Sequence, residues 1–326
     1  MEETAPPIVS QKVHDPESLA AAVRNTNLQA CQLSGRPLPS LIARLMCQRV
    51  CLDYASLGPA MLFSGSMPQD FYTLVFVTEC PENGRSFNFA TEHTDGFMGF
   101  FPPGVMLDAY TPEGYANATL TIPTTVFLAS VEQQFPEIPS GVLKRGACVR
   151  IGLPEQTRLR GLLSSVRTGM EHETEPLADV MVRKPLENAL LDAFLTALRS
   201  GCGSMVPDPR KRIEGRLRRL RQARDYMADN LHQPILLEDL CSVLGMSRRG
   251  VEVLFRDSLR IGPSAFLRHQ RLHGVRRALM SATPSHGVVK ETALSWGFWH
   301  MGHFSHEYQV LFGERPSMTL ARQRSA

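Results

Sequence analysis

Residues 235–256 read ILLEDLCSVLGMSRRGVEVLFR, and this stretch decides the fold of the C-terminal part of the chain. Apolar residues at helical spacing precede Gly245, a residue suited to the left-handed conformation that ends many helices. Ser247 is a good N-cap for a following helix, whose apolar positions are Val251, Leu254 and Phe255. A helix, a glycine turn and a capped helix with facing apolar stripes predict a helix-turn-helix.

A second helix-turn-helix is predicted further along, where residues 288–312 read VVKETALSWGFWHMGHFSHEYQVLF. Ala293 and Trp296 lie on the inner face of its first helix, and Gly297 makes the turn. Phe298 is expected to pack in the angle between the two helices, and Phe304 starts the buried stripe of the second one. Each helix-turn-helix therefore has apolar residues for a core of its own.

The stretch between them, PSAFLRHQRLHGVRRALM at 263–280, predicts one long connecting helix. Pro263 suits the first position of a helix, and apolar residues recur at helical spacing after it. A rigid connector would set the spacing of the two helix-turn-helix motifs, so that one chain reaches successive major-groove faces roughly 34 Å apart.

With these positions in place, residues 223–320 resemble the DNA-binding domain of the AraC/XylS family of bacterial transcription regulators. The resemblance implies a regulator that binds double-stranded promoter DNA, and that contacts RNA polymerase if it is an activator. Activation and repression both stay open. The positions that carry the resemblance are Leu237, Leu240, Cys241, Ser247, Val251, Leu254, Phe255, Arg256, Arg271, Leu272, Ala278, Leu279, Trp296, Gly297, Phe298, Trp299, Phe304, Phe312 and Gly313.

The sequence departs from the family pattern after each helix-turn-helix. Where the family usually has Gly-x-Ser-Pro, this chain has Arg260-Ile-Gly-Pro263 and then Gly313-Glu-Arg-Pro316. Each keeps the proline and loses the serine. The departures leave open how the next helices are capped and how far apart the two DNA half-sites lie.

Helix geometry and the family resemblance together select the DNA-contacting side chains. The first turns of a recognition helix enter the major groove while its apolar stripe stays on the protein. An arginine can grip a guanine edge, a glutamate can accept from cytosine, and valine can touch a thymine methyl group. The outward residues of the second recognition helix lack long hydrogen-bond donors. This indicates that the second helix contacts DNA mainly through shape and phosphates. The residues expected to face bases are Arg249, Glu252, Val253, Met301, Gly302, Ser305 and His306, and those expected at phosphates are Ser247, Arg248, Arg256, His300 and His303.

Charge supports a nucleic-acid partner for the C-terminal part. Residues 205–326 hold 20 Lys and Arg against 11 Asp and Glu, a net charge of +9, whereas residues 1–204 carry −6 within the overall +3. A basic domain releases counterions when it approaches phosphates. Two alternatives stay open: an ordinary solvated basic surface, and an architectural protein that binds DNA without choosing a sequence.

The N-terminal part predicts an α+β chain with a domain at 1–199. Short strand-like runs at 71–78, 86–90, 97–101, 105–110 and 118–122, split by Pro-Gly turns, indicate an antiparallel barrel or sandwich over about 40–123. In the family such a region is a cupin-like sensory barrel, whose mouth can hold a small effector. Its aromatic residues are either ligand contacts or plain core. The candidates are Phe71, Tyr72, Phe87, Phe89, Phe101 and Tyr110.

Helices are expected over about 124–199, followed by a linker at 200–211 and a DNA-binding domain at 212–326. The stretch 185–198 has an apolar stripe wide enough to dock on the barrel and to pair with a second subunit. Helices here commonly mediate dimerisation in the resembling family, so a homodimer is predicted. Packing within the chain alone is the alternative.

Other classes find little support in the sequence. His93 beside Glu92 and Asp95 cannot complete a metal site of a cupin enzyme, and no phosphate loop or nucleophile motif occurs. An enzyme domain fused to a DNA-binding module stays as the alternative to a regulator. The histidines at 300, 303 and 306 lack a completing cysteine or carboxylate, so no metal or cofactor is expected. The absence of a signal peptide or an apolar span predicts a cytoplasmic protein.

Overall fold

The computed structural model describes residues 8–23, 26–35, 39–81, 86–88, 91–93, 95–138, 140–171, 177, 179–202 and 210–322. These residues divide into two compact bodies, which are described separately. The N-terminal body holds residues 1–30, 39–58 and 63–208, and the C-terminal body holds residues 31–38, 59–62 and 209–326. In the described part no helix combines the length and the apolar character needed to cross a membrane.

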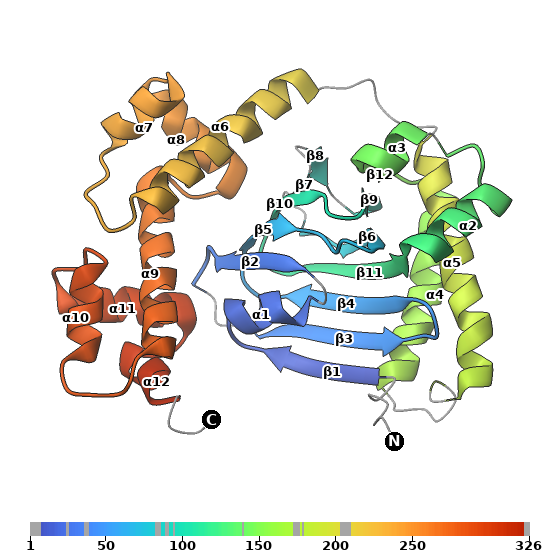
Figure 1. Cartoon of the computed structure of the whole chain (residues 1–326), viewed down its shortest axis with the longest axis horizontal. Coiled ribbons are helices and arrows are strands. Elements are labelled where there is room, and N and C mark those ends of the chain that lie inside the picture. Colours follow the sequence, from blue (N-terminus) through green and yellow to red (C-terminus); the bar gives the residue numbers. More distant parts are fainter. Residues whose placement is uncertain are drawn as a thin grey trace. The chain divides into compact units, whose positions relative to one another are not determined.

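Two sheets form the centre of the N-terminal body (Figure 1), and all neighbouring strands of the seven-stranded sheet are antiparallel. One has seven strands in the order β1-β3-β4-β11-β6-β9-β12, and the other has five in the order β2-β5-β10-β7-β8. The first comprises β1 (Ile8–Val13), β3 (Ser40–Met46), β4 (Cys51–Leu57), β11 (Tyr115–Pro123), β6 (Phe71–Glu79), β9 (Phe97–Phe101) and β12 (Ala147–Arg150). The second comprises β2 (Asn27–Gln32), β5 (Met61–Ser66), β10 (Met106–Thr111), β7 (Ser86–Asn88) and β8 (Thr91–His93).

The seven-stranded sheet has two different faces because side chains alternate along each strand. One face, with Leu52, Leu74, Leu120 and Ile122, belongs to the main apolar core, all four side chains being fully buried. Helices supply the rest of this core, and they are α2 (Thr124–Gln134), α3 (Ser140–Arg145), α4 (Leu153–Glu171) and α5 (Val180–Cys202). The opposite face carries polar side chains, among them Arg44, Asp53 and Thr119.

The predicted β-rich region was too narrow. Strands begin at Ile8 and include Ala147–Arg150, so they extend beyond 40–123 on both sides. The five strands predicted over 71–122 are all present with shifts of a few residues at their ends. They form two sheets rather than one closed barrel, which favours the sandwich among the two predicted forms.

The apolar stripe of α5 is used within its own chain. Leu190, Phe194, Ala197 and Leu198 are fully buried in the core of the N-terminal body. The helix also starts at Val180, so that Pro185 lies inside it rather than at its first position. The prediction that this stripe pairs with a second subunit is therefore wrong, and the structure of one chain leaves the homodimer itself untested.

The C-terminal body is helical and contains both predicted helix-turn-helix motifs. The first is α7 (Leu237–Leu244) and α8 (Arg248–Leu259), preceded by α6 (Arg210–Asp229), and the second is α10 (Val288–Ser295) and α11 (Met301–Phe312). The predicted connector is α9 (Pro263–Ser281), and α12 (Pro316–Ala321) ends the described chain. Predicted core residues are buried in each: Val251 and Phe255 in the first, Ala293 and Phe304 in the second.

The structure shows how the helices that follow each helix-turn-helix are capped, where the sequence departs from the family pattern. Arg260 and Gly313, which follow α8 and α11, both take the left-handed conformation, with φ of 60° and 71°. The next helices, α9 and α12, begin with proline and have no side-chain cap at Gly262 or Arg315. Backbone conformation and proline thus set these two turns, without a serine cap.

Candidate nucleic-acid interface

The first recognition helix, α8, starts at a cap that the sequence predicted. The Ser247 side chain accepts a hydrogen bond of 3.2 Å from the Gly250 backbone N–H. Before it, Gly245 ends α7 with φ of 59°, and its N–H bonds to the carbonyl groups of Cys241 and Ser242. These two local features fix the angle between α7 and α8. The face of α8 that lies opposite its apolar stripe is therefore turned outward.

The residues predicted to face bases from α8 lie on that outward face. Arg249 is exposed, and the Val253 side chain is 48% exposed although it is apolar. Glu252 pairs with Arg256 one turn later, at 3.4 Å. Because an exposed pair of this kind contributes little stability, both side chains can exchange partners at a DNA surface.

The three arginines of α8 differ in their partners within the protein. Arg248 forms an ion pair with Glu238 of α7, and Arg256 pairs with Glu252. For Arg249 the described part of the chain offers no acidic partner. An exposed guanidinium at the start of a recognition helix, without such a partner, is suited to the edge of a guanine.

The second recognition helix, α11, presents a shorter set of side chains. Gly302, His303 and His306 are exposed, whereas Met301 and Ser305 are partly buried. His300 is exposed at the N-cap position and makes no side-chain capping bond. The geometry agrees with the sequence in that no long donor points outward from the first turns of α11.

Arg271 and His232, for which the sequence predicts no contact, join the two helix-turn-helix motifs. Arg271 of α9 donates to the Leu231 carbonyl at 2.9 Å and to the Gln233 carbonyl at 2.6 Å, in the loop before α7. In the same loop His232 lies 3.0 Å from the Ser295 carbonyl at the end of α10, and its ring lies 4.2 Å from that of Trp296. We call these contacts the inter-motif clamp.

Gly274 of α9 is also required for this arrangement. A Cβ atom there would lie 2.1 Å from the Trp296 ring, so that only glycine permits the approach. The conspicuous Trp296 and Gly297 were found from the sequence. Their partners Gly274 and His232 were not, since they are distant in sequence and have no local pattern.

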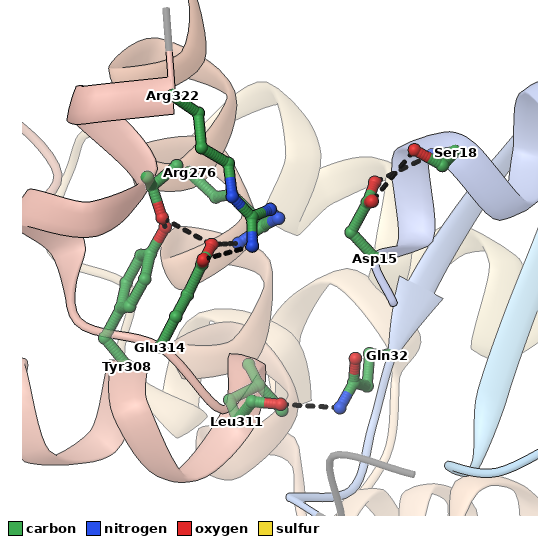
Figure 2. Close-up of polar contacts among 9 residues, drawn as sticks. Asp15, Ser18, Gln32, Arg276, Tyr308, Leu311, Glu314 and Arg322 are labelled. Carbon is green, nitrogen blue, oxygen red and sulfur yellow. Dashed lines mark hydrogen bonds and ion pairs between the residues drawn. The ribbon is translucent and has the colours of Figure 1, made fainter. Parts of the chain in front are cut away.

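A buried ion pair fastens α9 to the end of α11 (Figure 2). Arg276 and Glu314 are 2% and 6% exposed and lie 2.5 Å apart. The Thr319 hydroxyl donates to Glu314 at 2.7 Å and is itself 2.7 Å from the Tyr308 hydroxyl. Arg322 adds a second ion pair to Glu314, at 2.7 Å. Glu314 lies in the Gly313-Glu-Arg-Pro316 turn, directly before Arg315, which occupies the position of the family's serine.

Residues 31–35 belong to the C-terminal body, and Gln32 among them contacts α9 and α11. The Gln32 side chain donates to the Leu311 carbonyl at 2.5 Å (Figure 2). The Gln32 backbone N–H donates to His273 Nε2 at 3.0 Å. His273 is fully buried, and burial lowers its pKa to about 3. A neutral imidazole is therefore part of the packing around α9.

In the N-terminal body, a cavity of about 340 Å³ lies between the two sheets. Of the predicted effector residues, Phe71 and Phe101 line it. Tyr72 instead packs in the apolar core, with ring centroids 4.0 Å from Phe127, and Tyr110 is buried but is not among the lining residues. The Phe87 side chain and Phe89 lie outside the described residues.

Polar residues of this cavity were missed from the sequence. Within the described residues no three His, Cys, Asp or Glu side chains gather as a metal site would require. The polar lining consists mainly of threonine, asparagine and a paired arginine and aspartate. An alternation of threonines along strand 115–123 was the available signal, but it is also typical of a strand with one solvated face.

Comparisons with known proteins agree with this interface. A family model described as a helix-turn-helix domain matches residues 240–322. The chain is 31% identical over 160 residues to the probable thc operon regulatory protein of Rhodococcus erythropolis, covering 48% of this chain and 47% of that one. It is 36% identical over 99 residues to XylDLEGF operon transcriptional activator 3 of Pseudomonas putida, covering 30% of each. The match thus spans about half or less of the length of these relatives.

Among solved structures, the chain is similar to a probable AraC family transcriptional regulator from Rhodopseudomonas palustris. The identity is 39%, the match covers 32% of this chain and 96% of that one, and the TM-score is 0.31. The residues matched by the family model, 240–322, include the connecting helix α9 and nearly all of both helix-turn-helix motifs. The chain belongs to the AraC/XylS family of transcription regulators.

Proposed function

We propose that this protein is a sequence-specific, DNA-binding transcription regulator. In this proposal α8 and α11 each enter a major groove of promoter DNA, and α9 with the inter-motif clamp fixes their separation. The observation that supports it best is the pair of recognition helices, which expose Arg249, Val253, Gly302 and His306 on the face opposite their buried cores. The base contacts belong to Arg249, Glu252 and Val253, and α11 contributes shape and phosphate contact.

The N-terminal body is proposed to bind a small effector rather than to catalyse a reaction. Its cavity of about 340 Å³ is at the lower end of the range of small-molecule sites. For such control the effector must prefer one of two arrangements of the protein that differ in DNA affinity. The proposal also includes a homodimer. If the protein is an activator, it includes a contact with RNA polymerase. Since the α5 stripe is buried, a dimer would use another surface.

The test is selection of bound duplexes from a random DNA pool by the full chain at near-physiological salt. If the protein is a regulator, the selected duplexes should converge on a motif with two parts about 10 base pairs apart. The protein should then prefer that motif to unrelated duplexes by roughly 10³-fold or more. Failure to converge, with near-equal binding to every duplex, would reject the proposal and favour an architectural protein. Stoichiometric metal in the purified protein would favour the alternative of an enzyme fused to a DNA-binding module.

A further inference from the structure

The cavity of the N-terminal body has a floor made of one face of the seven-stranded sheet. Strand register brings Arg44, Asp53 and Thr119 into one cross-strand row, and Cys51, Thr121 and Thr73 into the next. All six residues line the cavity. The other side comes from the five-stranded sheet and is apolar at Leu28, Phe63, Leu107 and Ala109, with Thr111 as its polar member. A ligand here would meet apolar side chains on one side and polar groups on the other.

The charges of the cavity are compensated within the protein. Arg44 donates to both carboxylate oxygens of Asp53, at 2.6 and 3.1 Å, and to the Ala22 carbonyl at 2.7 Å. Arg49 is bound by the fully buried Glu187 at 2.5 Å. These three, Arg44, Asp53 and Arg49, are the charged residues among the described lining. An anionic ligand would have to break one of these pairs, at the cost of leaving a partly buried carboxylate uncompensated.

Two hydroxyl groups in the lining lack partners. Thr73 and Thr111 are 3% and 6% exposed, and among the described residues neither Oγ1 atom has a hydrogen-bond partner. Thr73 comes from the seven-stranded sheet and Thr111 from the five-stranded one. By contrast, the Thr119 hydroxyl donates to Asn117 Oδ1 at 3.2 Å. Because buried hydroxyls are nearly always bonded, the two unpartnered groups point to polar atoms supplied by a ligand.

We propose that the effector is an uncharged, largely apolar molecule with one or two hydroxyl or carbonyl groups, which hydrogen bond to Thr73 and Thr111. A carboxylate is disfavoured because the cavity offers it no free cation. This inference rests on the proposed function, since it assigns a chemical class to the effector of the regulator.

The test compares neutral probes with carboxylates of the same size, on the full chain. Benzyl alcohol, acetophenone and hexanol form one set, and benzoate and hexanoate form the other. Thermal unfolding is followed by circular dichroism at millimolar probe concentration. Neutral probes should raise the melting temperature by a few degrees and the carboxylates should not. Equal or larger shifts with the carboxylates, or none with any neutral probe, would overturn the inference.

Valine variants test the two hydroxyl groups directly. The double variant Thr73→Val and Thr111→Val removes unpartnered hydroxyls at nearly constant shape, so the ligand-free melting temperature should stay or rise. Each lost bond should weaken binding of the neutral probes roughly 2- to 10-fold. Thr119→Val is the matched control: it removes a bonded hydroxyl and should lower the ligand-free melting temperature. A drop in the double variant like that of the control, or unchanged probe affinity, would reject the assignment of Thr73 and Thr111.

The DNA selection separates failure of this inference from failure of the proposed function. A convergent two-part DNA motif together with a preference for carboxylates would reject the neutral effector and leave the regulator standing. Random DNA binding would reject the regulator, whatever the cavity binds.

Discussion

Arg249 and Arg256 lie on the same helix, and they are predicted to act differently on DNA. Arg249→Ala should relax the base preference at one position of the selected site, because a lost bidentate contact removes about 1–3 kcal/mol of discrimination there. Arg256→Ala should weaken binding to all duplexes alike, because a phosphate contact carries no sequence information. The measurement is competition binding with single-base variants of the site. Equal losses on every sequence for both variants would show the base assignment to be wrong.

Arg260 and Gly313 hold equivalent left-handed positions after the two recognition helices. In the described residues Arg260 is the non-glycine residue with positive φ, and this conformation costs a residue with a Cβ about 1 kcal/mol. Arg260→Gly should therefore stabilise the protein by about 0.5–1 kcal/mol, and Gly313→Ala should destabilise it by a similar amount. Urea unfolding measures both. Destabilisation by Arg260→Gly would mean that its side chain makes a compensating contact.

His273 predicts loss of stability in acid. Its pKa is lowered from 6.5 to about 3 by burial, so the folded state keeps the imidazole neutral while the unfolded state takes up a proton below pH 6.5. The free energy of unfolding should fall by about 1.4 kcal/mol per pH unit between pH 6.5 and about 3 from this residue. Urea unfolding at pH 7 and 5, followed by tryptophan fluorescence, compares the protein with His273→Gln. An equally steep loss in the variant would contradict this role.

Single residues show what the sequence can predict about a site. The outward positions of α8 follow from the period of a helix and the apolar stripe opposite, so the exposure of Arg249 and Val253 could be predicted. The positions of Thr73 and Thr111 could not, because a polar residue in a strand has the same local pattern whether it faces water or a cavity. The aromatic residues chosen in their place divide between cavity and core, as Phe101 and Tyr72 show. Only the pairing of the strands distinguishes the two cases.

At the scale of elements, the attachment of α9 to α11 depends on the buried Arg276–Glu314 pair. Glu314→Ala leaves the Arg276 guanidinium buried without its carboxylate and should destabilise the protein by about 3 kcal/mol or more. Adding Arg276→Met should recover part of that loss, because the uncompensated charge is removed. Urea unfolding measures the free energy of unfolding of the single and the double variant. A double variant no more stable than Glu314→Ala would contradict the charge argument.

Helices and strands were not equally predictable. The helices of the C-terminal body have glycine or proline at their ends, such as Gly245, Pro263 and Pro316, and these residues fix boundaries locally. The early strands lack such signals. Ser40–Met46, with the sequence SLIARLM, places Arg44 on the cavity face, so its apolar residues do not alternate strictly. Its identity as a strand depends on pairing with β1 and β4, which the local sequence does not specify.

At the scale of the whole molecule, one chain is proposed to contact two DNA elements through a fixed connecting helix. Arg271 is the residue that tests this rigidity, because it binds the loop before α7 from the middle of α9. Arg271→Ala leaves both recognition helices in place and releases part of the inter-motif clamp. The variant should therefore tolerate altered spacing better than the natural protein does.

The most direct measurement of this central claim is binding to the selected DNA site after half a helical turn, about 5 base pairs, is inserted between its two parts. We expect the insertion to lower the affinity to that of a single element, and the Arg271→Ala variant to lose less affinity than the natural protein. Equal affinity for the original and the lengthened site would contradict the claim, because the two helix-turn-helix motifs would then not be held in a fixed relation.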